Sequence, residues 1–85
     1  MCKDSLKDKI DNIIGEIFNC NFSNISKMTL EISEEIETNN IFAYDELNKD
    51  WKEILYYLMI SLENKDYLLL GDILNYELKT ILKRV

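Results

Sequence analysis

The chain has almost no residues that interrupt a helix. Its 85 residues include no proline and only two glycines, Gly15 and Gly71. Proline and glycine are the strongest helix breakers, whereas the abundant Leu, Glu and Lys favour helix. The sequence therefore predicts an all-α protein, in which short polar segments separate the helices.

Apolar residues recur at steps of three and four in four separate segments, which is the spacing of one helix face. We expect amphipathic helices at about residues 4–19, 24–38, 42–63 and 66–84. Ile14 and Phe18 widen the first stripe. The four stripes are Leu6, Ile10, Ile13, Ile17 and Cys20; Ile25, Met28, Ile32 and Ile36; Tyr44, Leu47, Trp51, Leu55, Leu58 and Leu62; and Tyr67, Leu70, Leu74, Leu78, Ile81 and Val85.

The connections between these segments are short and polar. Asn39 and Asn40 suit a turn, and Asp66 is placed as the N-cap of the last helix. The connection at 64–66 is so short that the last two helices must lie antiparallel. A compact up-and-down bundle of four helices, forming one domain over residues 1–85, is the leading fold. A three-helix core with one loosely attached helix is the alternative.

The charge balance excludes several classes of function. Ten Lys and Arg stand against 16 Asp and Glu, the net charge is −6, and the chain has no His. Nucleic acids and anionic membranes require a basic surface, so we expect neither as a partner. Without His, the commonest general base and metal ligand are missing. We therefore expect no enzyme activity, no catalytic residue, no metal and no cofactor.

The cysteines and the N-terminal segment bear on the compartment. Two cysteines, Cys2 and Cys20, are fewer than the disulfide framework of a small secreted domain contains. The N-terminal segment mixes Lys with Asp and lacks the apolar core of a signal peptide. No apolar run approaches the ~20 residues of a membrane span. We expect reduced thiols and a soluble cytoplasmic protein.

Negative charge is concentrated in the middle of the chain. Residues 28–66 carry three Lys and ten acids, whereas the flanking segments are close to neutral. Such a surface could steer a basic partner towards the protein. A solvated helix face gives the same pattern more often.

The aromatic residues outnumber the positions that a small core offers. Tyr56 and Tyr57 are adjacent and cannot share one helix face, so some aromatic surface must be exposed, as it is at protein interfaces. For Trp51 alone, core packing is the stronger interpretation. We predict a partner-binding surface on the last two helices that includes Trp51, Tyr56, Tyr57, Gly71, Tyr76 and Glu77.

Gly71 and Glu77 stand out within the last helix. Glycine inside a helix costs about 1 kcal/mol relative to alanine, and close approach of a neighbouring helix or a partner would offset that cost. Glu77 lies between Leu74 and Leu78 near an apolar seam, where a buried carboxylate needs a hydrogen-bonding partner. A half-exposed Glu that packs only its methylenes fits the pattern equally well.

Residues 63–78 also carry a family resemblance. The segment reads Glu-Asn-Lys-Asp-Tyr-Leu-Leu-Leu-Gly-Asp-Ile-Leu-Asn-Tyr-Glu-Leu. It resembles the C-terminal segment of small uncharacterised helical proteins of Firmicutes, which carry the pattern D-Y-x-L-L-x-D-x-L-x-Y-E-L and are associated with motility genes and export-chaperone-like bundles. The resemblance singles out Asp66, Asp72, Tyr76 and Glu77, which adds Asp72 to the predicted partner-binding surface, and it implies no catalytic activity. In that group Ala commonly stands at the position of Gly71.

Two classes of function fit these features. The first is a cytoplasmic interaction module, an adaptor or chaperone-like protein, that receives a helix of another protein in a groove. The second is a structural homodimer that buries its apolar excess against a second copy. A monomer with an exposed apolar groove would favour the first, and a dimer without one would favour the second.

Overall fold

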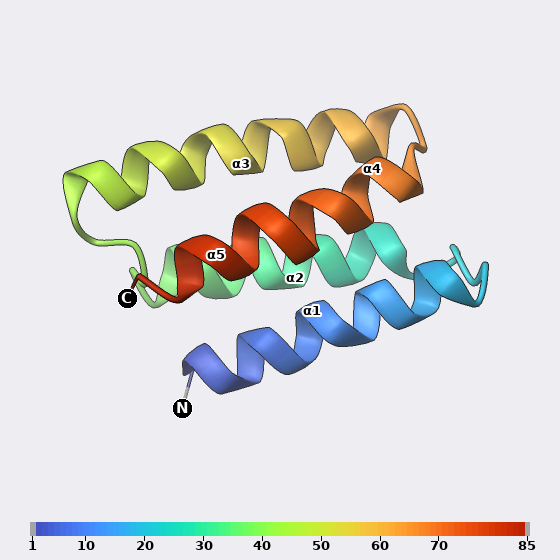
Figure 1. The fold of residues 1–85 in the computed structure, drawn as a ribbon, viewed down its shortest axis with the longest axis horizontal. Helices are drawn as coiled ribbons and strands as arrows, with labels where there is room; N and C mark the ends of the chain where they lie inside the picture. Colours follow the sequence, from blue (N-terminus) through green and yellow to red (C-terminus); the bar gives the residue numbers. More distant parts are fainter. Residues whose placement is uncertain (1, 85) are drawn as a thin grey trace.

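Four helical rods run back and forth across the molecule, each antiparallel to the one before it (Figure 1). The computed structural model describes the backbone of residues 2–84 and the side chains of residues 5–84. The described residues contain no strand, which confirms the predicted all-α bundle. The elements are α1, Cys2–Phe18; α2, Ile25–Thr38; α3, Asp45–Glu63; α4, Tyr67–Asp72; η1, Ile73–Leu78; and α5, Lys79–Leu82.

The last rod consists of α4, η1 and α5, which follow one another without a break, and we call it the C-terminal helix. It packs against α1 on one side and against α3 on the other. Helix α2 lies behind it and packs against α1 (Figure 1). The side of the C-terminal helix that faces the viewer in Figure 1 is therefore covered by no other helix of the bundle.

The core is built from one side of each helix. Burial of such side chains contributes roughly 1.5–3 kcal/mol each, which makes these contacts the main source of stability. Trp51 and Phe42 are the largest fully buried side chains. The other buried apolar residues are Leu6, Ile10, Ile13 and Ile17; Ile25, Ile32 and Ile36; Leu47, Ile54 and Leu58; and Leu70, Ile73, Leu74, Leu78, Ile81 and Leu82.

The first three rods end in the same backbone motif. Cys20, Asn40 and Lys65 adopt left-handed conformations, with φ of 56°, 49° and 55°. In each case two N–H groups bond back to the last turn at 2.8–3.2 Å, which is the Schellman arrangement that satisfies the free carbonyl groups of a helix end. The N–H to carbonyl pairs are Cys20 to Ile17 and Asn21 to Glu16; Asn40 to Glu37 and Ile41 to Ile36; and Lys65 to Leu62 and Asp66 to Ser61.

The observed bounds of α1 and α3 show that three residues of the predicted apolar stripes are not in the core. Because α1 ends at Phe18, Cys20 falls in the turn and is exposed, and Phe18 itself is exposed rather than in the core. Tyr44 precedes α3, which begins at Asp45 rather than at residue 42, and it too is exposed. Phe42 occupies the core there instead. Val85 lies outside the described residues.

The start of the C-terminal helix agrees with the sequence prediction. The Asp66 side chain accepts a hydrogen bond from the backbone N–H of Leu69 at 3.2 Å. Its carboxylate thus satisfies a free N–H group of the first turn and places negative charge at the positive end of the helix dipole. Only two residues separate α3 from this cap, and the two helices are antiparallel as predicted (Figure 1).

The π-helical stretch η1 was not predicted. A π-helix bonds each N–H to the carbonyl five residues earlier, which inserts one extra residue into a turn. In a regular α-helix, Glu77 would follow Ile73 and Leu74 by four and three residues and would share their buried face. In the structure Ile73, Leu74 and Leu78 are buried, whereas Glu77 is exposed. The inserted residue therefore turns the carboxylate out of the core and keeps the apolar residues inside it.

Candidate functional site: the outer face of the C-terminal helix

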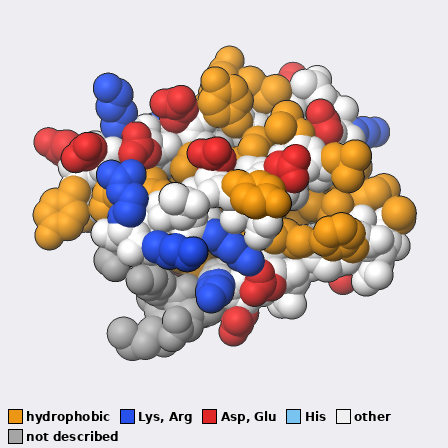
Figure 2. Space-filling view, in the orientation of Figure 1, with side chains coloured by type: hydrophobic (Ala, Val, Ile, Leu, Met, Phe, Trp, Pro, Cys, Tyr) orange, Lys and Arg blue, Asp and Glu red, His pale blue; other side chains and the backbone are white. Residues whose placement is uncertain are grey.

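Several large apolar side chains are exposed on one face of the bundle. Leu68, Leu69 and Tyr76 of the C-terminal helix are 79%, 41% and 65% exposed. Phe18 at the end of α1 and Tyr57 on α3 flank them, at 82% and 48% exposure. Figure 2 views the molecule from this side and shows apolar side chains over the C-terminal helix and its neighbours, with acidic groups among them. We call these five residues the outer face.

A groove follows the line where the C-terminal helix meets α3. It has a volume of about 540 Å³ and is lined by residues of both helices. Ile54, Ile73 and Ile81 form its apolar floor, because each is buried yet contributes to the lining. Glu53 of α3 and Glu77 of the C-terminal helix line it from opposite sides. We call this the α3 groove.

A second groove follows the contact between the C-terminal helix and α1. It has a volume of about 370 Å³, and we call it the α1 groove. Gly71, Asp72 and Tyr76 line it from the C-terminal helix, and Phe18 lines it from α1. Phe18 and Tyr76 are thus both outer-face residues and part of this lining.

Gly71 lies where α1 approaches the C-terminal helix. A Cβ atom at this position would lie 3.4 Å from Cδ1 of Ile17. The neighbouring helix that was expected to approach this glycine is therefore α1. At Gly15, by contrast, a Cβ atom would meet no other described side chain within 4 Å.

Most of the predicted partner-binding residues lie on this side of the molecule. Tyr57 and Glu77 line the α3 groove, whereas Gly71, Asp72 and Tyr76 line the α1 groove. Tyr56 lines neither groove. It is exposed and packs edge-to-face on Tyr57, with ring centroids 5.5 Å apart.

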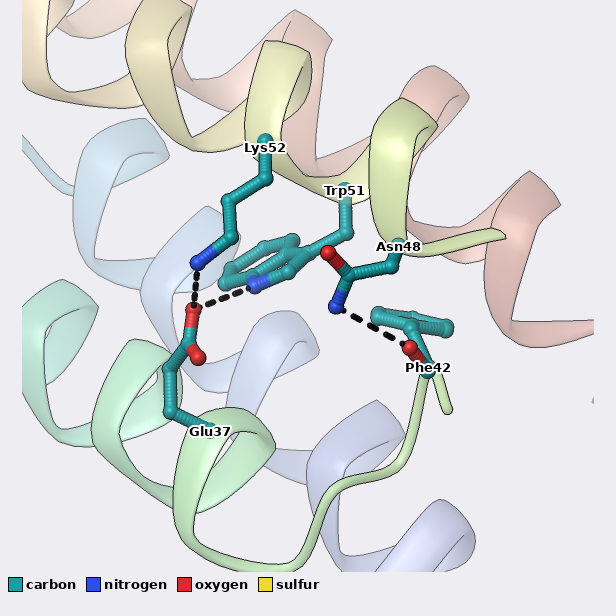
Figure 3. A network of polar contacts seen from close by, with 5 residues as sticks. All are labelled: Glu37, Phe42, Asn48, Trp51 and Lys52. Carbon is teal, nitrogen blue, oxygen red and sulfur yellow. Dashed lines mark hydrogen bonds and ion pairs between the residues drawn. The ribbon is translucent and has the colours of Figure 1, made fainter. Parts of the chain in front are cut away.

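Trp51 does not belong to the exposed surface. Its side chain is 1% exposed, in line with the expectation of core packing, so it is removed from the predicted partner-binding residues. The indole N–H donates to Oε1 of Glu37 at 2.8 Å, and the ammonium group of Lys52 lies 3.3 Å from the same oxygen (Figure 3). The hydrogen bonds from Trp51 and then from Lys52 favour the charged carboxylate and lower the pKa of Glu37.

The same cluster holds the connection between α2 and α3. Nδ2 of Asn48 donates to the carbonyl oxygen of Phe42 at 3.2 Å, and the Phe42 and Trp51 rings lie 5.8 Å apart (Figure 3). These contacts tie α2, the connection and the first turns of α3 together. Trp51 therefore positions α3 within the bundle.

The charged groups of the two grooves differ in their pairing. In the α1 groove, Lys79 forms an ion pair with Asp11. In the α3 groove, Arg84 pairs with Asp50 at 2.9 Å. Among residues 5–84, the structure shows no ion pair or hydrogen bond for the side chains of Glu53 and Glu77. The α3 groove therefore carries two uncompensated negative charges.

Sequence reasoning missed three residues of the outer face, namely Phe18, Leu68 and Leu69. Phe18 was assigned to a buried stripe, and its exposure depends on where α1 ends. Leu68 and Leu69 belong to an apolar run that also contains Tyr67 and Leu70. Four consecutive residues span more than one turn of helix, so they cannot all face the core. This run was the sequence feature that could have indicated the exposure of Leu68 and Leu69.

Within the described residues, no group of three or more Cys, Asp or Glu side chains is arranged to hold a metal ion. None of the described helices combines the length and the apolar character needed to cross a lipid bilayer.

Comparison with known proteins places the chain in a family. Residues 4–85 match the model of "Domain of unknown function (DUF8042)". No curated protein and no solved structure gave a significant match. The family match spans nearly the whole chain and includes the outer face and both grooves. This chain is therefore a member of the DUF8042 family.

Proposed function

We propose that the protein is a non-enzymatic interaction module, an adaptor or chaperone-like protein, that receives a helix of another protein on its outer face. The observation that carries this proposal is the group of five exposed apolar side chains from three helices on one side of a small bundle. Soluble monomers rarely leave large contiguous apolar patches uncovered. A partner that covers the outer face would remove these side chains from water.

The shape of this side of the molecule suits a helix. Each groove runs between two packed helices, and a third helix packs well along such a groove by fitting its ridges of side chains into it. Partner residues at spacings of three and four would then reach the groove floor. The α3 groove extends from Asp50 to Tyr57 on α3, which corresponds to about 10 Å or two helical turns.

We further propose that this interaction takes place in the cytoplasm. Cys20 is exposed and forms no disulfide in the structure. An exposed free thiol is typical of proteins in a reducing compartment. The thiol of Cys2 lies outside the described side chains. A chaperone-like role, which the resemblance of residues 63–78 implies, would be one form of the proposed function.

The alternative occupant of the outer face is a second copy of the chain. A two-fold dimer places the same surface of both copies in contact. Each copy carries a net charge of −6 and contributes Glu53 and Glu77 near that surface, so like charges would face each other. We therefore favour a different protein as the partner.

Site-specific photo-cross-linking in living cells tests the proposal. A photo-reactive benzoylphenylalanine replaces Tyr76, which is exposed on the outer face. The matched control replaces Tyr44, which is 78% exposed but lies before α3 and lines neither groove. We expect position 76, and not position 44, to cross-link to a helix of one defined protein, which then binds the unmodified chain when both are purified.

Two outcomes would contradict the proposal. An adduct of about twice the 10.1 kDa chain mass, together with a dimer in sedimentation experiments, would show that a second copy covers the face. Equal cross-linking from both positions, or an adduct whose purified partner does not bind, would show that the outer face is not a specific binding surface.

A further inference from the structure

We infer that the partner helix is cationic and amphipathic, and that it sits in the α3 groove with its cations beside Glu53 and Glu77. This inference rests on the proposed function and specifies the chemistry of the partner. It combines the apolar floor of the groove, the charges on its two walls and the helix geometry that places one of those charges there.

The walls of the α3 groove carry charge that the protein itself does not neutralise. Glu53 and Glu77 are both exposed, and they approach the groove from two different helices. The ion pairs among residues 5–84 engage Asp11, Glu35, Glu37 and Asp50 but not these two carboxylates. Between them lies a floor of isoleucine side chains. A helix with an apolar stripe flanked by Lys or Arg is complementary to this arrangement.

The π-helical stretch is an independent observation that points to Glu77. A regular α-helix would direct this residue towards the core, next to Ile73 and Leu74. Because η1 inserts one residue, Glu77 is exposed on the groove wall while Ile73 and Ile81 stay in the floor. Such local insertions in α-helices occur frequently at functional sites. The least regular segment of the bundle is thus the one that shapes this groove.

The α1 groove fits a cationic helix less well. Its Asp11 is already paired with Lys79, so Asp72 is its one acidic side chain without an ion pair in the described structure. In the α3 groove the Asp50–Arg84 pair lies near the end of the C-terminal helix. The other two acids of this groove, Glu53 and Glu77, are unpaired among the described residues. Charge complementarity therefore selects the α3 groove. It also disfavours a second copy, whose own groove walls are acidic.

Three designed peptides of about 18 residues, or five helical turns, provide the probe. They share one leucine stripe at helical spacing and differ in the flanking positions, which are Lys, Gln or Glu. Binding to the purified full chain is measured by fluorescence anisotropy, and the site is mapped by backbone amide chemical shifts. We expect the Lys peptide to bind most tightly, with the largest shifts at Ile54, Ile73 and Ile81. We also expect its affinity to fall as salt is raised.

Charge-neutralising variants test the two carboxylates directly. The double variant Glu53→Gln with Glu77→Gln should bind the Lys peptide about 3- to 10-fold more weakly, the effect expected of two partly exposed ion pairs. Glu31→Gln with Glu34→Gln is the matched control. It removes the same charge from exposed positions on α2, behind the C-terminal helix in Figure 1, and should leave the affinity unchanged.

The outcomes separate this inference from the proposed function. If the Gln peptide binds as tightly as the Lys peptide, or if both double variants weaken binding equally, the inferred charge recognition is wrong but helix binding stands. Shifts confined to the α1 groove would likewise overturn the assignment of the site alone. If none of the three peptides binds, both the inference and the proposed function fail.

Discussion

At the scale of single residues, Trp51 shows how one side chain serves both packing and electrostatics. Its ring fills the core and its N–H reaches the edge of the bundle, where it donates to Glu37. Tryptophan combines a large apolar surface with one polar group in this way. Its conspicuous position in the sequence therefore reflects a structural role, and the aromatic residues of the proposed partner-binding surface are others.

The carboxylate of Glu37 provides a pH-dependent test of this contact. Replacement of Trp51 by Phe removes the hydrogen bond that contributes most to the lowered pKa of Glu37. We expect that pKa to rise towards the ordinary value of 4.5 in an NMR titration of the Glu37 carboxyl group. Lys52→Met should also raise it, because the hydrogen bond and the positive charge of Lys52 both favour the charged carboxylate. An unchanged pKa in the Phe variant would contradict the contact.

The sign of the effect on stability follows from the direction of the shift. Because folding lowers the pKa of Glu37, the charged carboxylate stabilises the folded state at pH values above 4.5. That contribution is lost as the pH falls through the lower pKa of the folded protein. We therefore expect the stability difference between the wild type and Trp51→Phe to become smaller in acid.

The left-handed residues at the helix ends give a second prediction at this scale. Lys65 adopts a φ of 55°, which is unfavourable for a residue with a side chain and free of steric cost for glycine. Lys65→Gly should therefore stabilise the protein by about 1 kcal/mol in thermal or chemical unfolding. The control Asn64→Gly lies one residue earlier at a φ of −86° and should destabilise it. Destabilisation by both glycines would contradict the Schellman end.

At the scale of the elements, most of the fold could be predicted from the sequence. The spacing of apolar residues placed all four helices to within a few residues, because each helix buries one side against the same core. The ends were less predictable. Cys20 and Lys65 occupy positions where glycine is the usual signal, and the short polar segments did not show which residue would turn left-handed.

The candidate site was predictable in part. Tyr57, Tyr76 and Glu77 were selected because the chain has more aromatic residues than its core can hold and because Glu77 interrupts an apolar seam. The reason that Glu77 is exposed could not be predicted, because the spacing argument assumes 3.6 residues per turn throughout. A π-helical insertion changes, within one turn, the side of the helix on which the following residues lie. It can be recognised only when the buried residues before and after it are known.

Deletion of Glu77 tests the π-helical insertion. Without this residue, Leu78 and Leu82 would follow Leu74 by three and seven residues, which is a regular α-helical stripe. The C-terminal helix could then relax to α-helix and keep its core contacts. We expect the deletion to change the free energy of unfolding by no more than about 1 kcal/mol, measured by chemical denaturation, and to leave the helical circular dichroism intact.

The matched control deletes Glu53 from the regular helix α3. That deletion rotates all later residues of α3 by about 100° relative to Trp51 and moves Ile54 and Leu58 out of the core. The loss of several buried side chains, at about 2–5 kcal/mol each, should unfold a domain of this size. If both deletions prove equally damaging, the C-terminal helix does not contain a removable insertion.

At the scale of the whole molecule, the arrangement of the helices leaves one side open. The C-terminal helix has α1 and α3 at its two sides, and α2 lies behind it. Its front surface is therefore in contact with solvent or with a partner (Figure 1). A chain of 85 residues buries a smaller share of its surface on folding than a larger domain does, so each apolar residue that faces outward is one that the core does not gain. Under the proposed function, those residues contribute to binding a partner instead of to the core.

The stability of the bundle should therefore be independent of the outer face. Leu68 and Tyr76 are 79% and 65% exposed, so replacing both by Ser removes little buried surface. We expect the free energy of unfolding to change by less than about 1 kcal/mol, because surface substitutions have small effects. Binding of the partner that position 76 identifies should nevertheless become weaker, because two apolar side chains of the outer face are lost. Leu70→Ser is the control: this residue is 0% exposed, and its replacement should cost several kcal/mol. If the double variant were as unstable as Leu70→Ser, the outer face would be part of the folded core and could not be kept exposed for a partner.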